Sequence, residues 1–144
     1  MSKEIRETIG ESLLEILPPL TNAVNDMINA AKGAENANKL SPELFPKVHK
    51  LSAHARKLLA PVYSYLSDEN ITKLSKSDIE LFRIWLNALE NLGKSIDIFL
   101  YLIEKSIEKN DISDQKEGHS LNDAVNFLFE ASREIADLID VLYK

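Results

Sequence analysis

The chain has 144 residues and a formal net charge of −6 at pH 7. This length suits one domain with a sizeable hydrophobic core, so we expect residues 1–144 to form a single domain. The absence of cysteine excludes disulfides, thiolate catalysis and cysteine-ligated metal sites, and it agrees with a reducing, cytoplasmic location. This excess of acidic over basic residues argues against the binding of nucleic acid by the surface as a whole.

No segment is typical of a signal peptide or of a membrane-spanning helix. The first fifteen residues contain four glutamates, which a signal peptide would not carry. The longest unbroken apolar run covers residues 98–103, whereas a bilayer-spanning helix needs about 20 apolar residues. We therefore expect a soluble protein with no membrane partner.

A first helix is predicted over residues 2–32, because apolar residues recur there at helical spacing. Pro18 and Pro19 fall inside this pattern, and each proline removes a backbone hydrogen-bond donor. We therefore expect either one kinked helix or two helices nearly in line. Gly33 is expected to end the segment, since glycine is common just after the last turn of a helix.

A second helix is predicted from Ser41 to about residue 66. Ser41 is a suitable N-cap, and Pro42 fits the first helical position because its missing N–H is not needed there. Apolar residues continue at helical spacing to the end of the segment. Pro61 is expected to kink the helix near its end.

The most strongly patterned segment covers residues 78–109, and it predicts the central helix of the fold. One apolar row has the heptad-like spacing of a packed helix: Phe82, Trp85, Leu89, Leu92, Ile96, Phe99 and Ile103. A second row runs beside it: Leu81, Ile84, Ala88, Ile98 and Leu102. Ser77 and Glu80 are expected to form its capping box. Gly93 is expected to mark the close approach of a neighbouring helix.

A last helix is predicted to open at Ser120, with Asp123 as its capping partner. Its expected seam consists of Leu121, Val125, Leu128, Ser132, Ile135, Ile139 and Leu142. No segment shows the alternation typical of a strand. We predict an all-α fold, an antiparallel four-helix bundle of up-down-up-down order, with its first two helices kinked or broken at prolines.

The sequence contains no arrangement typical of catalysis or metal binding. His49 and His54 are five residues apart, which turns them about 140° from each other on a helix, whereas metal-binding helices space their ligands by three or four. The carboxylates fall on exposed helix positions, and none stands out at a buried seam position. There is no glycine-rich phosphate loop or serine nucleophile motif. We expect a protein that is not an enzyme and has no cofactor or metal.

Residues 47–57 form a basic segment without any acidic residue. Its candidate anion-binding residues are Lys47, Lys50, His54, Arg56 and Lys57. They could contact phosphates or an acidic partner. Alternatively, they could face the acidic last helix or form a solvated surface. Nucleic-acid binding would normally require a larger basic excess.

A second candidate surface combines the third and fourth helices. A hairpin that turns near residue 114 would place residue i beside about residue 229 − i, so residues 98–103 would lie beside residues 124–129. Tyr101 and Phe127 would then lie on polar faces at matching heights. This arrangement predicts a partner-binding patch of Ile98, Tyr101, Phe127 and Phe129. The alternative is local packing, because isolated exposed aromatic residues are common.

The sequence thus favours a non-enzymatic helical adaptor or assembly subunit, with a protein partner or a second copy on this patch. The alternative function is a binding module for an anionic ligand, nucleic acid included, through the basic segment.

Overall fold

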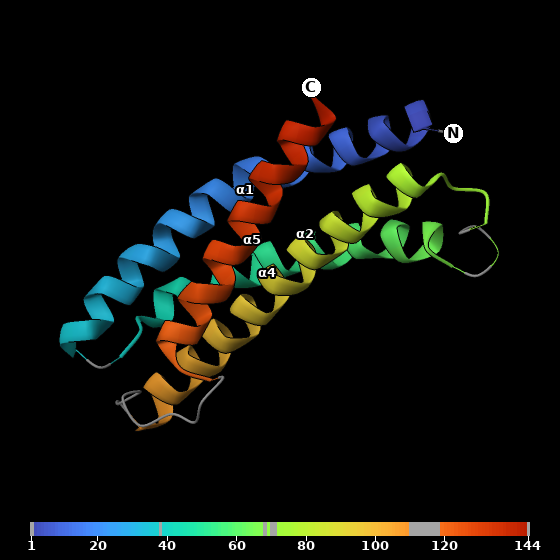
Figure 1. The fold of residues 1–144 in the computed structure, drawn as a ribbon. Helices are drawn as coiled ribbons and strands as arrows, with labels where there is room; N and C mark the ends of the chain where they lie inside the picture. The colour runs from blue at the N-terminus through green and yellow to red at the C-terminus, as the bar shows by residue number, and fades with distance from the viewer. Residues whose placement is uncertain (1, 38, 68, 70–71, 110–118, 144) are drawn as a thin grey trace.

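The structure is a computed structural model that describes residues 2–37, 39–67, 69, 72–109 and 119–143 (Figure 1). These residues form four α-helices and one 3₁₀ turn, and no β-strand. The predicted all-α class is therefore confirmed, and the four helices pack against one another around a shared core. None of the described helices combines the length and the apolar character needed to cross a membrane.

Helix α1 (Ser2–Ala37) is continuous through Pro18 and Pro19, so the prolines do not separate two helices. Buried apolar side chains lie on both sides of the two prolines, which keeps this segment packed on the core despite the lost backbone hydrogen bonds. The predicted end at Gly33 is wrong, because the helix continues for another turn. Ala34 is only 3% exposed, so that turn still packs against the core.

The turn η1 (Pro42–Leu44) leads into helix α2 (Phe45–Tyr65). Ser41 is the N-cap, as predicted, and its Oγ accepts a hydrogen bond from the Glu43 backbone N–H at 3.3 Å. It caps the 3₁₀ turn, however, and the α-helix begins only at Phe45. Pro61 lies inside α2, and a kink at this proline stays a prediction.

Helix α4 (Lys76–Lys109) is the central helix, as predicted. It contacts α1, η1, α2 and α5, and its contact with α5 is the most extensive in the fold. The largest core side chains belong to it: Phe82, Trp85 and Phe99 are each at most 1% exposed. Tyr65 at the end of α2 stacks on Phe82, with ring centroids 4.8 Å apart.

Two sequence predictions about α4 are wrong. Its first turn is capped by Ser75 and not by Ser77, because Ser75 Oγ accepts a hydrogen bond from the backbone N–H of Asp78 at 3.1 Å. Asp78 is only 1% exposed, so the expectation that no carboxylate is buried at a seam position also fails. A carboxylate in the first turn is favoured by the partial positive charge of the helix N-terminus.

Helix α5 (Leu121–Leu142) begins with the predicted capping box of Ser120 and Asp123. Its buried face, however, differs from the predicted seam. The residues that reach the core are Ala124, Leu128, Ala131, Ile135 and Leu138. Of the predicted seam, only Leu128 and Ile135 are buried, and the remaining five residues are half-buried. Helix α5 is therefore rotated about its own axis relative to the prediction. The five half-buried residues of the predicted seam lie at the edge of its buried face.

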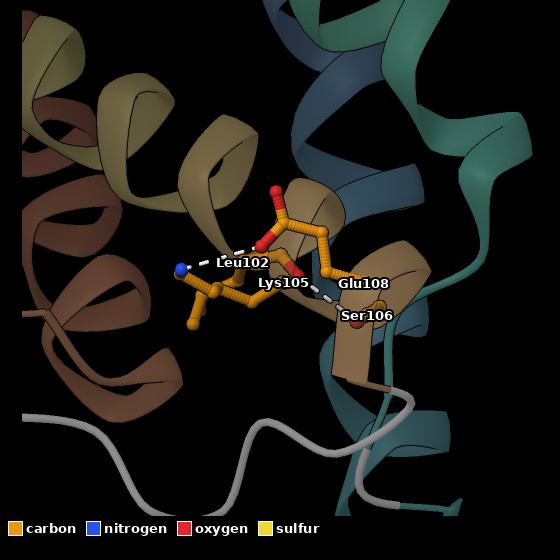
Figure 2. Close-up of polar contacts among 4 residues, drawn as sticks. All are labelled: Leu102, Lys105, Ser106 and Glu108. Atoms are coloured by element: carbon orange, nitrogen blue, oxygen red, sulfur yellow. Dashed lines mark hydrogen bonds and ion pairs between the residues drawn. The ribbon is translucent and has the colours of Figure 1, made fainter.

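Buried serines connect the elements. Ser95 Oγ donates a hydrogen bond of 2.7 Å to the Ala124 carbonyl and so ties α4 to α5. Ser106 Oγ accepts a hydrogen bond from the Leu40 N–H at 2.8 Å and donates one to the Leu102 carbonyl, the second of which is drawn in Figure 2. Among the described residues, no buried side-chain nitrogen or oxygen lacks a partner. The core thus meets the requirement that buried polar atoms be hydrogen-bonded.

Candidate functional site

The basic segment of α2 faces α1. Lys47 Nζ lies 3.3 Å from Asp26 Oδ2, and Lys57 Nζ lies 3.3 Å from Glu15 Oε1. The interpretation that this segment faces the acidic last helix is therefore wrong for these two lysines. All four charged side chains are exposed by more than a third. Exposed ion pairs of this kind contribute about 0–1 kcal/mol each to the stability of the fold.

The predicted anion-binding residues do not converge on one site. Lys50 lines a cleft of about 520 Å³ between α1 and α2, together with Pro19, Asn22, Asn25, Asp26 and Lys47. Arg56 lines a different hollow, between α2 and α4, and His54 is half-buried. The set is thus divided between two sides of α2.

The hollow between α2 and α4 has a volume of about 290 Å³ and contains charges of both signs. Arg56 and Lys94 line it together with Glu90 and Asp97, and Gly93 lies among them. A Cβ atom built on Gly93 would meet nothing within 4 Å, so the predicted close approach of a helix at this glycine is wrong. Its balanced charges give this hollow no preference for an anion.

Tyr63 lies beside this hollow, and its hydroxyl donates a hydrogen bond of 3.3 Å to Glu90 Oε1. Partial desolvation raises the pKa of the Tyr63 phenol, and the negative charge and hydrogen bond of Glu90 raise it further. The phenol is therefore neutral at neutral pH and is not a candidate general base.

Helices α4 and α5 pack in a different register from the predicted one. Three contacts define it: Ser95 with Ala124, Lys94 with Phe127, and Tyr101 with His119. Residue i of α4 therefore lies beside about residue 220 − i, and not beside 229 − i. Consequently α5 starts near Tyr101, and the last two turns of α4 extend past its beginning by about 12 Å at 1.5 Å per residue.

This register separates the two aromatic residues that were predicted to lie at one height. Phe127 lies under Lys94, with Nζ 5.4 Å from the ring centroid. Tyr101 is seven residues further along α4, or about 10 Å away along the helix axis. Both rings are half-buried, and Ile98 is only 8% exposed. The α4–α5 face therefore offers little free apolar surface.

Lysine side chains cover this face further. Lys105 Nζ lies 5.5 Å from the Tyr101 ring centroid. The same ammonium group pairs with Glu108, and Figure 2 shows this ion pair. His119 contacts the same ring edge-on, with centroids 5.7 Å apart. These cation–π contacts explain why two aromatic residues lie on polar helix faces, because each ring packs against a lysine of the same chain.

Phe129, the fourth residue of the predicted patch, lies on another face. Two residues along a helix correspond to a rotation of about 200°, so Phe129 and Phe127 point to opposite sides of α5. Phe129 is 53% exposed and lines a groove of about 340 Å³ between α5 and α1. The other residues that line this groove are Ile28, Ala31, Lys32, Leu121, Asn122 and Val125. The structure thus does not bring Phe129 together with the other three.

A second groove lies at the other end of the contact between α1 and α5, near both chain termini (Figure 1). It has a volume of about 580 Å³ and is lined by Arg6, Glu7, Gly10, Glu11, Leu14, Leu142 and Tyr143. Leu14 and Tyr143 are the most exposed large apolar side chains of the described residues, at 69% and 68%. A Cβ atom on Gly10 would lie 3.5 Å from the Tyr143 hydroxyl, so α5 ends directly beside this part of α1.

Half-buried apolar residues of α1 lie between the two grooves, whereas on α5 Ser132 and the exposed Ala136 separate Phe129 from Ile139. On α1, Leu17 and Val24 share a helical face with Leu14 and Ile28, because these positions are three or four residues apart or multiples of that spacing. On α5, Ile139 precedes Tyr143 by one turn. We call this set the α1–α5 strip: Leu14, Leu17, Val24, Ile28, Phe129, Ile139 and Tyr143. Its two ends are exposed and its middle is half-buried.

Of this strip, the sequence singled out only Phe129 as a surface residue. Two signals could have identified the exposed ends. Leu14 directly follows Leu13, which occupies the buried row, so Leu14 must point away from the core. Tyr143 follows Phe129 by fourteen residues, or two heptads, so both lie on one face of α5.

Within the described residues, no three histidine, cysteine or acidic side chains lie close enough to hold a metal ion. No protein-family model matches the chain, and neither a curated protein sequence nor a solved structure matches it.

Proposed function

We propose that this protein is a non-enzymatic helical adaptor or assembly subunit that binds another protein through the α1–α5 strip. The observation that carries the proposal is the exposure of Leu14, Phe129 and Tyr143, which border two grooves along the contact between α1 and α5. Single exposed apolar residues are ordinary on protein surfaces, but several of them beside grooves along one pair of helices are typical of interaction sites.

The α1–α5 strip is favoured over the predicted α4–α5 patch by accessibility. Tyr101 and Phe127 are half-buried and covered by lysines, whereas the ends of the strip face solvent. We retain the α4–α5 face, with Ile98, Tyr101 and Phe127, as a smaller second contact. In that arrangement a partner would have to displace Lys94 and Lys105 from the two rings.

The architecture that we propose for this adaptor is an up-down-up-down bundle in a cytoplasmic protein, with bends at its helix prolines. Two observations support opposite directions for successive helices. Lys47 pairs with Asp26 whereas Lys57 pairs with Glu15, so residue numbers rise along α2 as they fall along α1. The contacts between α4 and α5 follow the same inverse order.

A test of the proposal places a photo-crosslinking amino acid at Phe129 in the cells that make the protein. The matched control carries it at Asn87, an exposed residue of α4 outside the strip. We expect one protein to be captured from Phe129 and not from Asn87. The purified protein should then bind the unmodified chain and lose at least tenfold in affinity on Phe129→Asp, because a carboxylate cannot be buried without a partner.

An alternative outcome would contradict the proposal. If the captured protein bound Phe129→Asp as tightly as the unmodified chain, the strip would not be its binding site. Circular dichroism of the variant must show unchanged helix content, which separates a lost contact from a lost fold.

The second candidate function is the binding of an anionic ligand in the cleft between α1 and α2. Lys47 and Lys50 line this cleft beside the side chains of Asn22 and Asn25, which can donate hydrogen bonds. Binding of this kind should weaken steeply with salt, and Lys50→Glu should abolish it. Unchanged binding of an oligonucleotide or inorganic phosphate by Lys50→Glu would remove this candidate.

A further inference from the structure

The groove at the Leu14–Tyr143 end of the strip is bordered by acidic side chains. Glu7 and Glu11 both line it, and both are exposed. Asp140 is also exposed and precedes Tyr143 by three residues, so it lies on the same side of α5. Within the described chain, none of these three carboxylates forms a salt bridge. Arg6 is the basic residue among those that line this groove.

The acidic border differs from the acidic residues that lie further around α1, on the side of α2. Glu15 and Asp26 face α2, where Lys57 and Lys47 neutralise them. Among the described residues, the fold therefore pairs the α1 carboxylates nearest α2 and leaves Glu7 and Glu11, beside the apolar strip, without a salt bridge.

The length and pattern of the strip fit a helical partner. From Leu14 to Ile28 the strip extends about 21 Å along α1, at 1.5 Å per residue. This is the length of about four helical turns. A groove between two helices can accept the apolar face of a third helix, with anchors at positions i, i+3, i+4 and i+7.

We infer that the partner presents an amphipathic helix to the α1–α5 strip, with an apolar face flanked by lysine or arginine. This inference rests on the proposed function and specifies its partner. Basic flanks on such a helix would lie against Glu7, Glu11 and Asp140, and this charge complementarity would set its orientation and raise its association rate.

A second copy of the chain fits the strip less well. It would bring its own Glu7, Glu11 and Asp140 to the contact, and repulsion between like charges would oppose association. Two of its three α2 lysines, Lys47 and Lys57, are already paired with α1 of their own chain, which leaves Lys50 to offset three carboxylates.

The test uses two synthetic helical peptides of about 18 residues with identical leucines at the i, i+3, i+4 and i+7 positions. One carries lysines beside the apolar face and the other carries glutamates. Fluorescence anisotropy should show that the lysine peptide binds the full chain at least tenfold more tightly. A Glu7→Gln, Glu11→Gln double variant should reduce this preference several-fold. The matched control, Glu80→Gln, changes an exposed acidic residue of α4 and should leave it unchanged.

Three results would overturn the inference, and they separate it from the proposed function. Equal binding of both peptides, lost on Phe129→Asp, would retain the strip as a docking site but reject a basic partner. Failure of the lysine peptide to bind better than a scrambled version at about 1 mM would reject the basic helix. The crosslinking test would then still show whether the strip is a protein-binding site. A dimer that Leu14→Glu converts to a monomer would assign the strip to a second copy.

Discussion

Gly93 in the middle of α4 offers a direct test of the helix packing. The sequence suggested that a neighbouring helix approaches this glycine closely, which would make any side chain destabilising. The structure shows the opposite, because a Cβ atom at this position would meet nothing within 4 Å. Gly93→Ala should therefore stabilise the protein.

The magnitude follows from helix propensity. Alanine is favoured over glycine inside a helix by about 1 kcal/mol, since glycine loses more backbone freedom on folding. For a chain of this size, such a gain corresponds to an increase of about 2–4 °C in the melting temperature. Urea unfolding followed by circular dichroism should show a higher midpoint at an unchanged slope, the sign of a change in stability alone.

Gly33→Ala is the matched control, because Gly33 also lies inside a helix and its Cβ position is also free of neighbours within 4 Å. The two variants should be stabilised to a similar extent. Loss of stability in Gly93→Ala, combined with a gain in Gly33→Ala, would refute the reasoning and show that a neighbour does occupy the space beside Gly93.

Three further predictions concern polar contacts. Ser95→Ala should lower the free energy of unfolding by about 0.5–1.5 kcal/mol, because the interhelical hydrogen bond from Ser95 Oγ is lost while the Ala124 carbonyl keeps its donor within α5; urea unfolding measures this. Ser120→Ala should cost about 0.5–2 kcal/mol through loss of the N-cap, whereas an unchanged midpoint would contradict the capping box. Glu90→Gln should lower the pKa of Tyr63 in an ultraviolet titration. Because folding raises this pKa, the associated stability is present below about pH 10 and is lost as the pH rises further.

The core of α4 could be predicted from the sequence because its pattern reflects burial directly. All seven residues of its predicted main row are buried, from Phe82 to Ile103. A helix covered on more than one side must carry apolar residues on more than one row, and that excess is visible without a structure. The caps at Ser41 and Ser120 were also predictable, since each depends on one side chain and its own backbone.

The errors arise where a local signal competes with packing or where two local signals are equivalent. Gly33 is a weak stop signal of about 1 kcal/mol, and burial of Ala34 outweighs it. Ser75 with Asp78 and Ser77 with Glu80 have the same spacing, so the sequence alone could not decide between the two caps. The register of α4 and α5 depends on where the chain re-enters the bundle, and no single residue encodes that position.

The misassigned face of α5 has the same origin as the candidate site. This helix carries two apolar rows, and the row with the larger side chains was taken as the core seam. The structure instead turns the small residues Ala124 and Ala131 towards α4, which lets the two helices approach closely enough for Ser95 to reach the Ala124 carbonyl. Leu121, Val125 and Leu142 of the larger row then line the grooves beside α1, where they are only half-buried.

The energetics of the strip explain why its acidic border matters. Burying the exposed parts of Leu14, Phe129 and Tyr143 would contribute about 3–5 kcal/mol, given about 1.5–3 kcal/mol for a fully buried large side chain. A free energy of about 4 kcal/mol corresponds to a dissociation constant near 1 mM, before the cost of ordering the partner. Apolar contact alone would therefore hold a partner only weakly. In the proposed complex, charged contacts with Glu7, Glu11 and Asp140 would add a modest further affinity and would supply most of the selectivity for a basic partner.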